Sequence, residues 1–179
     1  MIEVRHVELR DRAEWSRLRL ALWPDEGEEA HRSAVERFFA APRTRDAMPE
    51  AVLIAVAPEA SPAVIGFAEV SRRAYAEGCE TSPVGFLEGW YVIPERRGQG
   101  VGRALLAAAE AWARTLGCRE FASDAVADNA VGAAAHRALG FEEVVVLRCF
   151  RKSLSGPRVE SVPPPELGGT SRGSFASPG

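Results

Sequence analysis

Residues 91–106 read YVIPERRGQGVGRALL and lead from an apolar strand pattern directly into a helix-forming run. Pro94 ends the strand, and three glycines then stand on alternate positions: Gly98, Gly100 and Gly102. Glycines at this spacing allow successive backbone N–H groups to converge on one point, where the helix start adds the positive end of its dipole. The turn therefore suits a pyrophosphate, and Arg97 or Arg103 would support it with a charged hydrogen bond.

Strand and helix patterns on both sides of this turn predict a mixed α/β sheet. We expect strands over residues 2–7, 51–57, 64–73, 84–93, 119–123 and 144–151. Helices are expected from Asp11, as the N-cap, to Pro24, around residues 35–39, from 100 to 116, and from Asp128 or Asn129, as the N-cap, to Leu139. The predicted order is β-α-α-β-β-β-α-β-α-β, with an antiparallel hairpin formed by the second and third strands.

The composition limits the class of protein. The 179 residues carry a formal net charge of −3 with a sequence pI near 5.7, so the chain lacks the basic surface that a nucleic-acid partner requires. No apolar run approaches about 18 residues and the N-terminus has no signal-peptide pattern, which predicts a cytoplasmic protein with no membrane partner. Cys79, Cys118 and Cys149 lie far apart without a histidine at ligand spacing, so we expect neither a disulfide nor a metal site.

The chain is expected to form one domain over residues 1–154. Residues 155–179 are rich in proline, glycine and serine, and we expect a disordered tail there. Aromatic residues on regular strand or helix positions are assigned to the core: Trp15, Trp90, Trp112, Phe121 and Phe141. His6 and His31 are assigned to the surface.

A glycine-rich turn between a strand and a helix also occurs in dinucleotide-binding folds. Asp124, at the end of the next strand, would then be the acid that binds the ribose. Three features disfavour that fold: the turn follows a run of hairpin strands, its third glycine has a different spacing, and arginines immediately precede it.

The sequence Arg97-Gly98-Gln99-Gly100-Val101-Gly102 resembles the [Q/R]-x-x-G-x-[G/A] loop of the GNAT N-acetyltransferases, and Val92-Ile93-Pro94 is similar to the end of their fourth strand. Asn129 lies eleven residues before Gly140-Phe141, which resembles the second half of the GNAT acyl-CoA site. The resemblance implies a single GNAT domain with acetyl-CoA as co-substrate. It also implies cofactor-binding residues: Tyr91 and Val92 at the pantetheine arm, the loop from Arg97 to Arg103 at the pyrophosphate, and Asn129.

A narrower similarity over roughly residues 1–154 includes Leu22-Trp23-Pro24, the stretch 75–84, Phe86-Leu87-Glu88-Gly89 and Ala122-Ser123-Asp124. These blocks resemble aminoglycoside 6'-N-acetyltransferases and imply a cationic acceptor that is contacted by Trp23, Tyr75, Glu88 and Asp124. The acidic turn 25–29, with Glu26, would stand nearby. Some relatives carry a histidine in place of Glu26 and an acid in place of Val145, which leaves the preferred drug open.

The implied chemistry is direct attack of an amine on the thioester in a ternary complex. A primary amine is mostly protonated at neutral pH, and Glu88 is the candidate base, directly or through water; the alternative is a structurally paired glutamate. Asp124 would orient the ammonium group. His136 stands where many GNAT enzymes carry a tyrosine that protonates the leaving thiolate, although the thiolate could also leave unassisted.

Two alternative functions are also compatible with the sequence, and so is more than one oligomeric state. The acceptor could be another small amine, such as a polyamine or an amino sugar, or the domain could bind acyl-CoA or the drug without chemistry. Relatives of this kind are commonly homodimers, and residues 144–151 could pair across such an interface.

Overall fold

The computed structural model describes residues 2–40, 50–59 and 63–154. The expected tail 155–179 lies outside these described residues. The chain divides into a compact unit over Met1–Val146 and a second unit over Leu147–Gly179. The described part of the second unit, residues 147–154, contains no helix or strand.

The first unit is built on one five-stranded sheet with the spatial order β1-β2-β3-β4-β5. The strands are β1 (Glu3–His6), β2 (Ala51–Val56), β3 (Val64–Arg73), β4 (Val84–Val92) and β5 (Phe121–Ser123). Neighbours from β1 to β4 pair antiparallel, which confirms the predicted hairpin, and β5 pairs parallel with β4. The sheet is therefore mixed.

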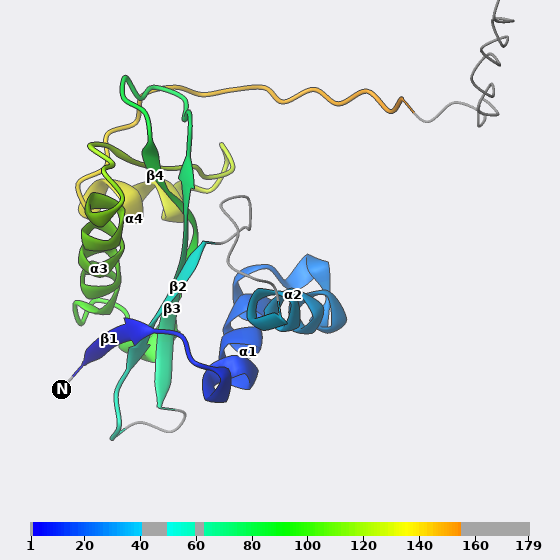
Figure 1. Cartoon of the computed structure of the whole chain (residues 1–179), viewed down its shortest axis with the longest axis vertical. Coiled ribbons are helices and arrows are strands. Elements are labelled where there is room, and N and C mark those ends of the chain that lie inside the picture. Colours follow the sequence, from blue (N-terminus) through cyan, green and yellow to red (C-terminus); the bar gives the residue numbers. More distant parts are fainter. Residues whose placement is uncertain (1, 41–49, 60–62, 155–179) are drawn as a thin grey trace, which may run out of the picture. The chain divides into compact units, whose positions relative to one another are not determined.

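Helices cover both faces of this sheet (Figure 1). The helices α1 (Arg12–Leu22) and α2 (Glu28–Ala40) lie on one face, and α3 (Val101–Thr115) and α4 (Ala130–Ala138) on the other. Three short 3-10 turns complete the described elements: η1 (Leu9–Asp11), η2 (Pro24–Glu26) and η3 (Pro94–Arg96). Gly117 and Gly140 follow α3 and α4 with positive φ values of 81° and 95°, as helix-ending glycines do.

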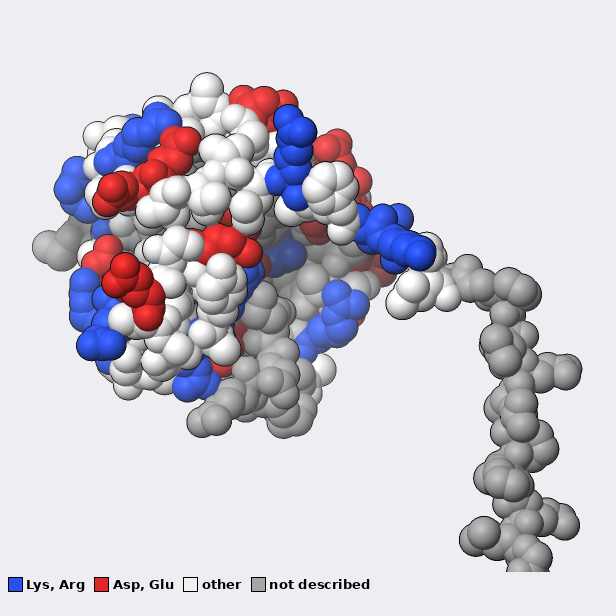
Figure 2. Space-filling model, turned by 90° about the horizontal axis from the view of Figure 1, so that it is seen from above, with Lys and Arg blue, Asp and Glu red and all other residues white. Residues whose placement is uncertain are grey.

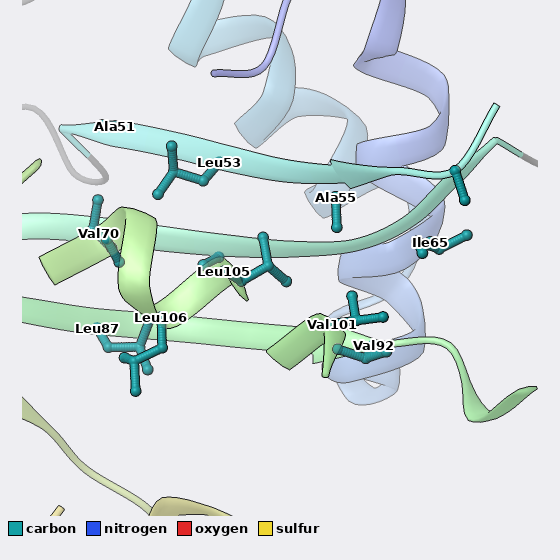
Figure 3. Close-up of a cluster of buried hydrophobic side chains, with 13 residues drawn as sticks. Ala51, Leu53, Ala55, Ile65, Val70, Leu87, Val92, Val101, Leu105 and Leu106 are labelled. Carbon is teal, nitrogen blue, oxygen red and sulfur yellow. The ribbon is translucent and has the colours of Figure 1, made fainter. Parts of the chain in front are cut away.

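Because both faces are covered, successive residues of the central strands enter two different cores. Leu53 and Ala55 of β2 belong to the core beneath α3, together with Val70, Leu87 and Leu105 (Figure 3). Their neighbours Val52 and Ile54 belong to the core beneath α1 and α2. Trp15 is 1% exposed in this second core, and the other aromatic residues assigned to the core pack against the first one while partly buried: Trp90, Trp112, Phe121 and Phe141.

The strand expected over residues 144–151 does not form. The described residues from Phe141 to Leu154 contain no helix or strand, and the exposed fractions of Val146 and Phe150 are 69% and 92%. A strand requires a neighbour that exchanges backbone hydrogen bonds with it, and none of the described strands pairs with this segment. Its β-branched composition alone did not produce a strand.

Two local expectations are also wrong. The carboxylate of Asp11 does not cap α1, because it accepts hydrogen bonds from the Arg5 guanidinium at 2.8 and 3.0 Å and from the Glu8 N–H at 2.8 Å. His31 is not a surface residue, since it is completely buried in α2, whereas His6 is exposed as expected.

Candidate functional site

The edge of β4 that faces β5 is paired along only part of its length. Three residue pairs join the two strands, from Gly85↔Phe121 to Leu87↔Ser123, whereas β4 continues to Val92 and stays paired with β3 on its other side. Beyond Leu87, this edge has no strand partner among the described residues. Unpaired backbone N–H and C=O groups at a sheet edge can bind an extended ligand as an added strand would.

A β-bulge lies where the two strands separate. Val70 pairs with Leu87 and Glu69 pairs with Gly89, so Glu88 is an extra residue on β4. The bulge interrupts the alternation of side chains: Leu87 and Trp90 pack on the α3 side, whereas Gly89 faces Trp23 at the end of α1. Glu88 consequently projects on the α1–α2 side of the sheet, beside the unpaired edge.

The Glu88 carboxylate is held by β3. The Arg73 guanidinium donates from Nε to Oε1 at 3.1 Å and from Nη2 to Oε2 at 2.6 Å, and the Ser71 hydroxyl donates to Oε1. The guanidinium carbon lies 3.4 Å from the centroid of the Phe86 ring. Glu88 is therefore an ion-paired carboxylate, which is the alternative that the sequence left open, and its side chain is 16% exposed.

Trp23 forms one wall beside this bulge. A Cβ on Gly89 would lie 2.4 Å from its ring, so the indole packs directly on the β4 backbone. The ring also makes an edge contact with Phe67, with centroids 6.2 Å apart, and stacks on His31 at 6.4 Å. His31 Nε2 lies 2.8 Å from the Trp23 carbonyl oxygen, so the buried histidine fixes both the ring and the backbone.

A buried ion pair beneath Trp23 was not foreseen from the sequence. The Glu69 carboxylate accepts hydrogen bonds from the Arg19 guanidinium and, at 2.8 Å, from Trp15 Nε1. Burial raises the pKa of Glu69, and the charge of Arg19 offsets part of this rise. The Arg19 guanidinium lies 4.8 Å from the centroid of the Trp23 ring, and this cation–π contact helps to hold the ring in place. The sequence contains one signal of this ion pair, a glutamate inside the apolar strand 64–70. A buried charge needs a partner, so this glutamate indicates a buried basic residue beside it.

The glycine-rich turn has the backbone shape that an anion requires. Gly98 and Gly100 have φ values of +71° and +86°, and no described atom lies within 4 Å of the position that a Cβ would take on either. The first intrahelical bond of α3 runs from the Ala104 N–H to the Gly100 carbonyl at 3.0 Å, so the preceding N–H groups have no acceptor within the helix. The N–H groups at the start of α3 are thus available to an anion, and the space beside the two glycines is open, which fits a diphosphate.

Two side chains of the turn donate hydrogen bonds to neighbouring backbone carbonyls. Gln99 Nε2 donates to the Glu95 carbonyl at 2.8 Å, and Arg97 Nε donates to the Val92 carbonyl at 3.0 Å. The Arg97 guanidinium also lies 5.4 Å from the Tyr91 ring centroid, so it links the turn to the end of β4. Arg97 is nevertheless exposed to solvent. Arg103 is exposed and makes no hydrogen bond or ion pair with residues that the structure describes, which leaves it available to a phosphate.

Gly102 is needed for another reason than Gly98 and Gly100. A Cβ on Gly102 would lie 2.7 Å from the Trp90 ring, so α3 can approach β4 only with glycine at this position. Val101, next to it, is 1% exposed and belongs to the core.

His136 connects α4 to the point where β4 and β5 separate. Its Nδ1 lies 2.8 Å from the Gly132 carbonyl and its Nε2 lies 2.9 Å from the Ser123 hydroxyl, which is itself 3.2 Å from the Leu87 carbonyl. Asn129 caps α4, because its Oδ1 accepts from the Gly132 N–H at 2.8 Å. Its side-chain NH2 donates to no described residue and is available to a ligand.

The remaining predicted acceptor residues are exposed. Tyr75 is 66% exposed in the β3–β4 connection, and Asp124 directly follows β5 without a hydrogen bond or ion pair to any described residue. Glu26 lies in η2, with Oε2 3.7 Å from His31 Nδ1, and so stands next to Trp23. The structure thus groups Glu88, Trp23 and Glu26 on one face, whereas no contact among the described residues joins Tyr75 or Asp124 to them.

Acidic and basic side chains are interspersed on the face shown in Figure 2. Within the described ranges, no cluster of three or more His, Cys, Asp or Glu side chains could hold a metal ion. None of the described helices combines the length and apolar character needed to cross a bilayer.

The sheet that splits beside a glycine turn is the arrangement expected of an acyl-CoA N-acyltransferase. The family model of the acetyltransferase (GNAT) family matches residues 14–141, and the chain belongs to this family. It is 52% identical to the aminoglycoside N(6')-acetyltransferase type 1 of Klebsiella aerogenes over 151 residues, 84% of this chain and 96% of that protein. The protein of the same name from Stenotrophomonas maltophilia is 46% identical over 155 residues, 84% and 93% of the two chains.

Solved structures agree with this assignment. AAC(6')-Iy in complex with the bisubstrate analogue CoA-S-monomethyl-acetylneamine superimposes with a TM-score of 0.75 at 38% identity, covering 86% of this chain and 99% of that one. The aminoglycoside 6'-N-acetyltransferase AAC(6')-Ih from Acinetobacter baumannii gives a TM-score of 0.76 at 33% identity, with 87% and 100% covered.

Proposed function

We propose that this chain is an aminoglycoside 6'-N-acetyltransferase, which transfers the acetyl group of acetyl-CoA to the 6'-amino group in a ternary complex. One observation carries the proposal: the unpaired edge of β4 lies directly beside the bulge that presents the Glu88 carboxylate. High identity to aminoglycoside acetyltransferases over 84% of the chain supports the choice of acceptor.

The residues present fit coenzyme A. The unpaired edge of β4 from Glu88 to Val92 would hold the pantetheine arm, and the N–H groups from Gly98 to Arg103 would hold the diphosphate. Asn129 would contact the same molecule with its free NH2. Acetyl-CoA supplies the thioester; the protein places that carbonyl beside Glu88.

Side chains around the bulge account for the acceptor. Glu88 accepts a hydrogen bond and then the proton of the attacking amine, while Trp23 covers a sugar ring. Glu26 and Asp124 are exposed carboxylates with no arginine partner among the described residues, and they bind the remaining ammonium groups together with Tyr75. His136, through Ser123, returns a proton to the departing thiolate.

We also propose that the protein is a homodimer in the cytoplasm, with residues 1–154 as the domain and 155–179 as a tail. Residues 144–147 expose apolar side chains, with fractions of 59, 46, 69 and 54%, and lack a strand partner within the described chain. A second copy would supply that partner. Size-exclusion chromatography with light scattering should give twice the mass of 19.3 kDa, and a monomer at micromolar concentration would refute the dimer.

The function is tested by thiol release from acetyl-CoA with purified protein. A panel of 2-deoxystreptamine antibiotics with a 6'-amino group should support turnover, while matched drugs with a 6'-hydroxyl and polyamines should not. Turnover only with polyamines would show another small-amine acetyltransferase. Drug binding without thiol release would show a sequestering protein instead.

A further inference from the structure

We propose that Arg73 is a positioning residue. It holds the Glu88 carboxylate in an orientation that leaves a single acceptor position, one lone pair of Oε2, for the acceptor amine. The inference rests on the proposed acetyl transfer. It concerns a residue of β3 that lies outside the glycine turn, the acidic turn and the other residues assigned to the acceptor.

The hydrogen bonds of the carboxylate can be counted. An ionised carboxylate has about four acceptor positions, two on each oxygen. Oε1 accepts from the Ser71 hydroxyl and from Arg73 Nε, while Oε2 accepts from Arg73 Nη2 at 2.6 Å. Both positions of Oε1 are occupied, so an incoming amine finds one acceptor, on Oε2.

The guanidinium is itself held in place. Arg73 and Ser71 are two residues apart on β3 and so point to the same face, where the bulge also directs Glu88. The Phe86 ring lies against the guanidinium at 3.4 Å, and the Arg73 side chain is only 33% exposed. A planar, bidentate donor fixes the plane of the carboxylate, which a lysine ammonium at the same place would not do.

The arginine partners of the two buried glutamates also indicate which residues attract the cationic acceptor. Glu69 and Glu88, on the same face, are each neutralised by an arginine, Arg19 and Arg73. Attraction for a polycation must therefore come from exposed, unneutralised acids such as Asp124. Arg73 should then affect the turnover number more than the apparent affinity for the acceptor.

The test compares Arg73→Ala, Arg73→Lys and Arg72→Ala with the wild-type chain. Arg72 is the matched control, because it is the adjacent arginine and is also paired with a glutamate, Glu50, at 3.6 Å. We expect Arg73→Ala to lower kcat about tenfold or more while both KM values stay within about threefold, and added methylguanidinium to restore several-fold activity. Arg73→Lys should recover only part of the loss, and Arg72→Ala should keep the wild-type kcat.

Three outcomes would overturn the inference: a wild-type kcat in Arg73→Ala, a loss that methylguanidinium does not relieve, or full activity in Arg73→Lys. If Arg73→Ala fails to fold, as judged by its circular dichroism melt, the Lys variant decides alone, because it keeps the stem and the charge. Wild-type protein that acetylates no antibiotic would refute the proposed function instead, which separates the two failures.

Discussion

Gly89→Ala tests whether Trp23 and Glu88 share one acceptor site. Gly89 has no positive φ, so alanine adds no backbone strain, but its Cβ would lie 2.4 and 2.5 Å from two carbon atoms of the Trp23 ring. Carbon atoms in contact are about 3.5–4.0 Å apart, so the ring must retreat by about 1 Å or more. Phe67 and His31 oppose that movement from the other sides.

The expected cost follows from this overlap. Overpacking of a buried site destabilises a protein by about 1–3 kcal/mol, which corresponds to a decrease in Tm of about 2–12 °C for a chain of this size. Displacing a wall of the acceptor site by about 1 Å should raise the KM for the aminoglycoside about tenfold or more. The KM for acetyl-CoA should change by less than about twofold, because the added methyl group points to Trp23 on the α1–α2 side, whereas the pantetheine arm would pair with the backbone of this edge.

Steady-state kinetics and a thermal melt measure both effects. Gly102→Ala is the matched control, since it places the same methyl group 2.7 Å from Trp90 on the α3 side of the sheet. This control should raise the KM for acetyl-CoA and leave the acceptor KM nearly unchanged. A lowered Tm in Gly89→Ala with an unchanged acceptor KM would refute the reasoning, because Trp23 would then be structural only.

Two further changes test other parts of the site, and a third tests a hydrogen-bonded glutamate outside it. Gly100→Val combines a side chain in the anion cradle with a φ of +86°, and should raise the KM for acetyl-CoA about tenfold; an unchanged value would exclude the cradle. Glu88→Gln removes the proton acceptor and should lower kcat about 100-fold, and a wild-type kcat would reduce Glu88 to a scaffold residue. Hydrogen bonds from the Thr81 hydroxyl and the Glu80 N–H lower the pKa of Glu120. Its stabilisation is therefore present above its unfolded pKa of about 4.3 and is lost as the pH falls through the lower folded value. Melts between pH 3 and 7 should show this loss in the wild type, and Glu120→Gln should flatten it; identical profiles would contradict the assignment.

The order of the elements up to α4 could be predicted because its signals are local. Pro94, the glycines of the turn and Asn129 each act on the backbone within a few residues, so their positions fix where β4 ends and where α3 and α4 begin. The identity of the glycine turn follows from the same local chemistry.

The geometry of the acceptor side could not be predicted, because it depends on strand pairing. The register shift opposite Glu69 turns Glu88 and Gly89 toward the same face. A glycine inside a strand, such as Gly85 or Gly89, can mark a bulge, but it does not give the register of the pairing. The partnership of Glu88 with Arg73 depends on that same shift. His31 was misplaced because its helix presents it to Trp23, a contact that arises only after α1 and α2 pack together.

The strand expected at 144–151 shows the limit of composition. Its β-branched residues favour an extended backbone, but a strand also needs a neighbouring edge. None of the described strands pairs with this segment, so composition alone did not give a strand.

The most direct test is to locate the acetyl group by NMR in the product formed from a kanamycin-type antibiotic. The proposed function, which similarity to aminoglycoside N(6')-acetyltransferases supports, predicts a single product that carries the acetyl group on the 6'-amino nitrogen. Acetylation at a ring amine of 2-deoxystreptamine, or recovery of unmodified drug with intact acetyl-CoA, would contradict the account.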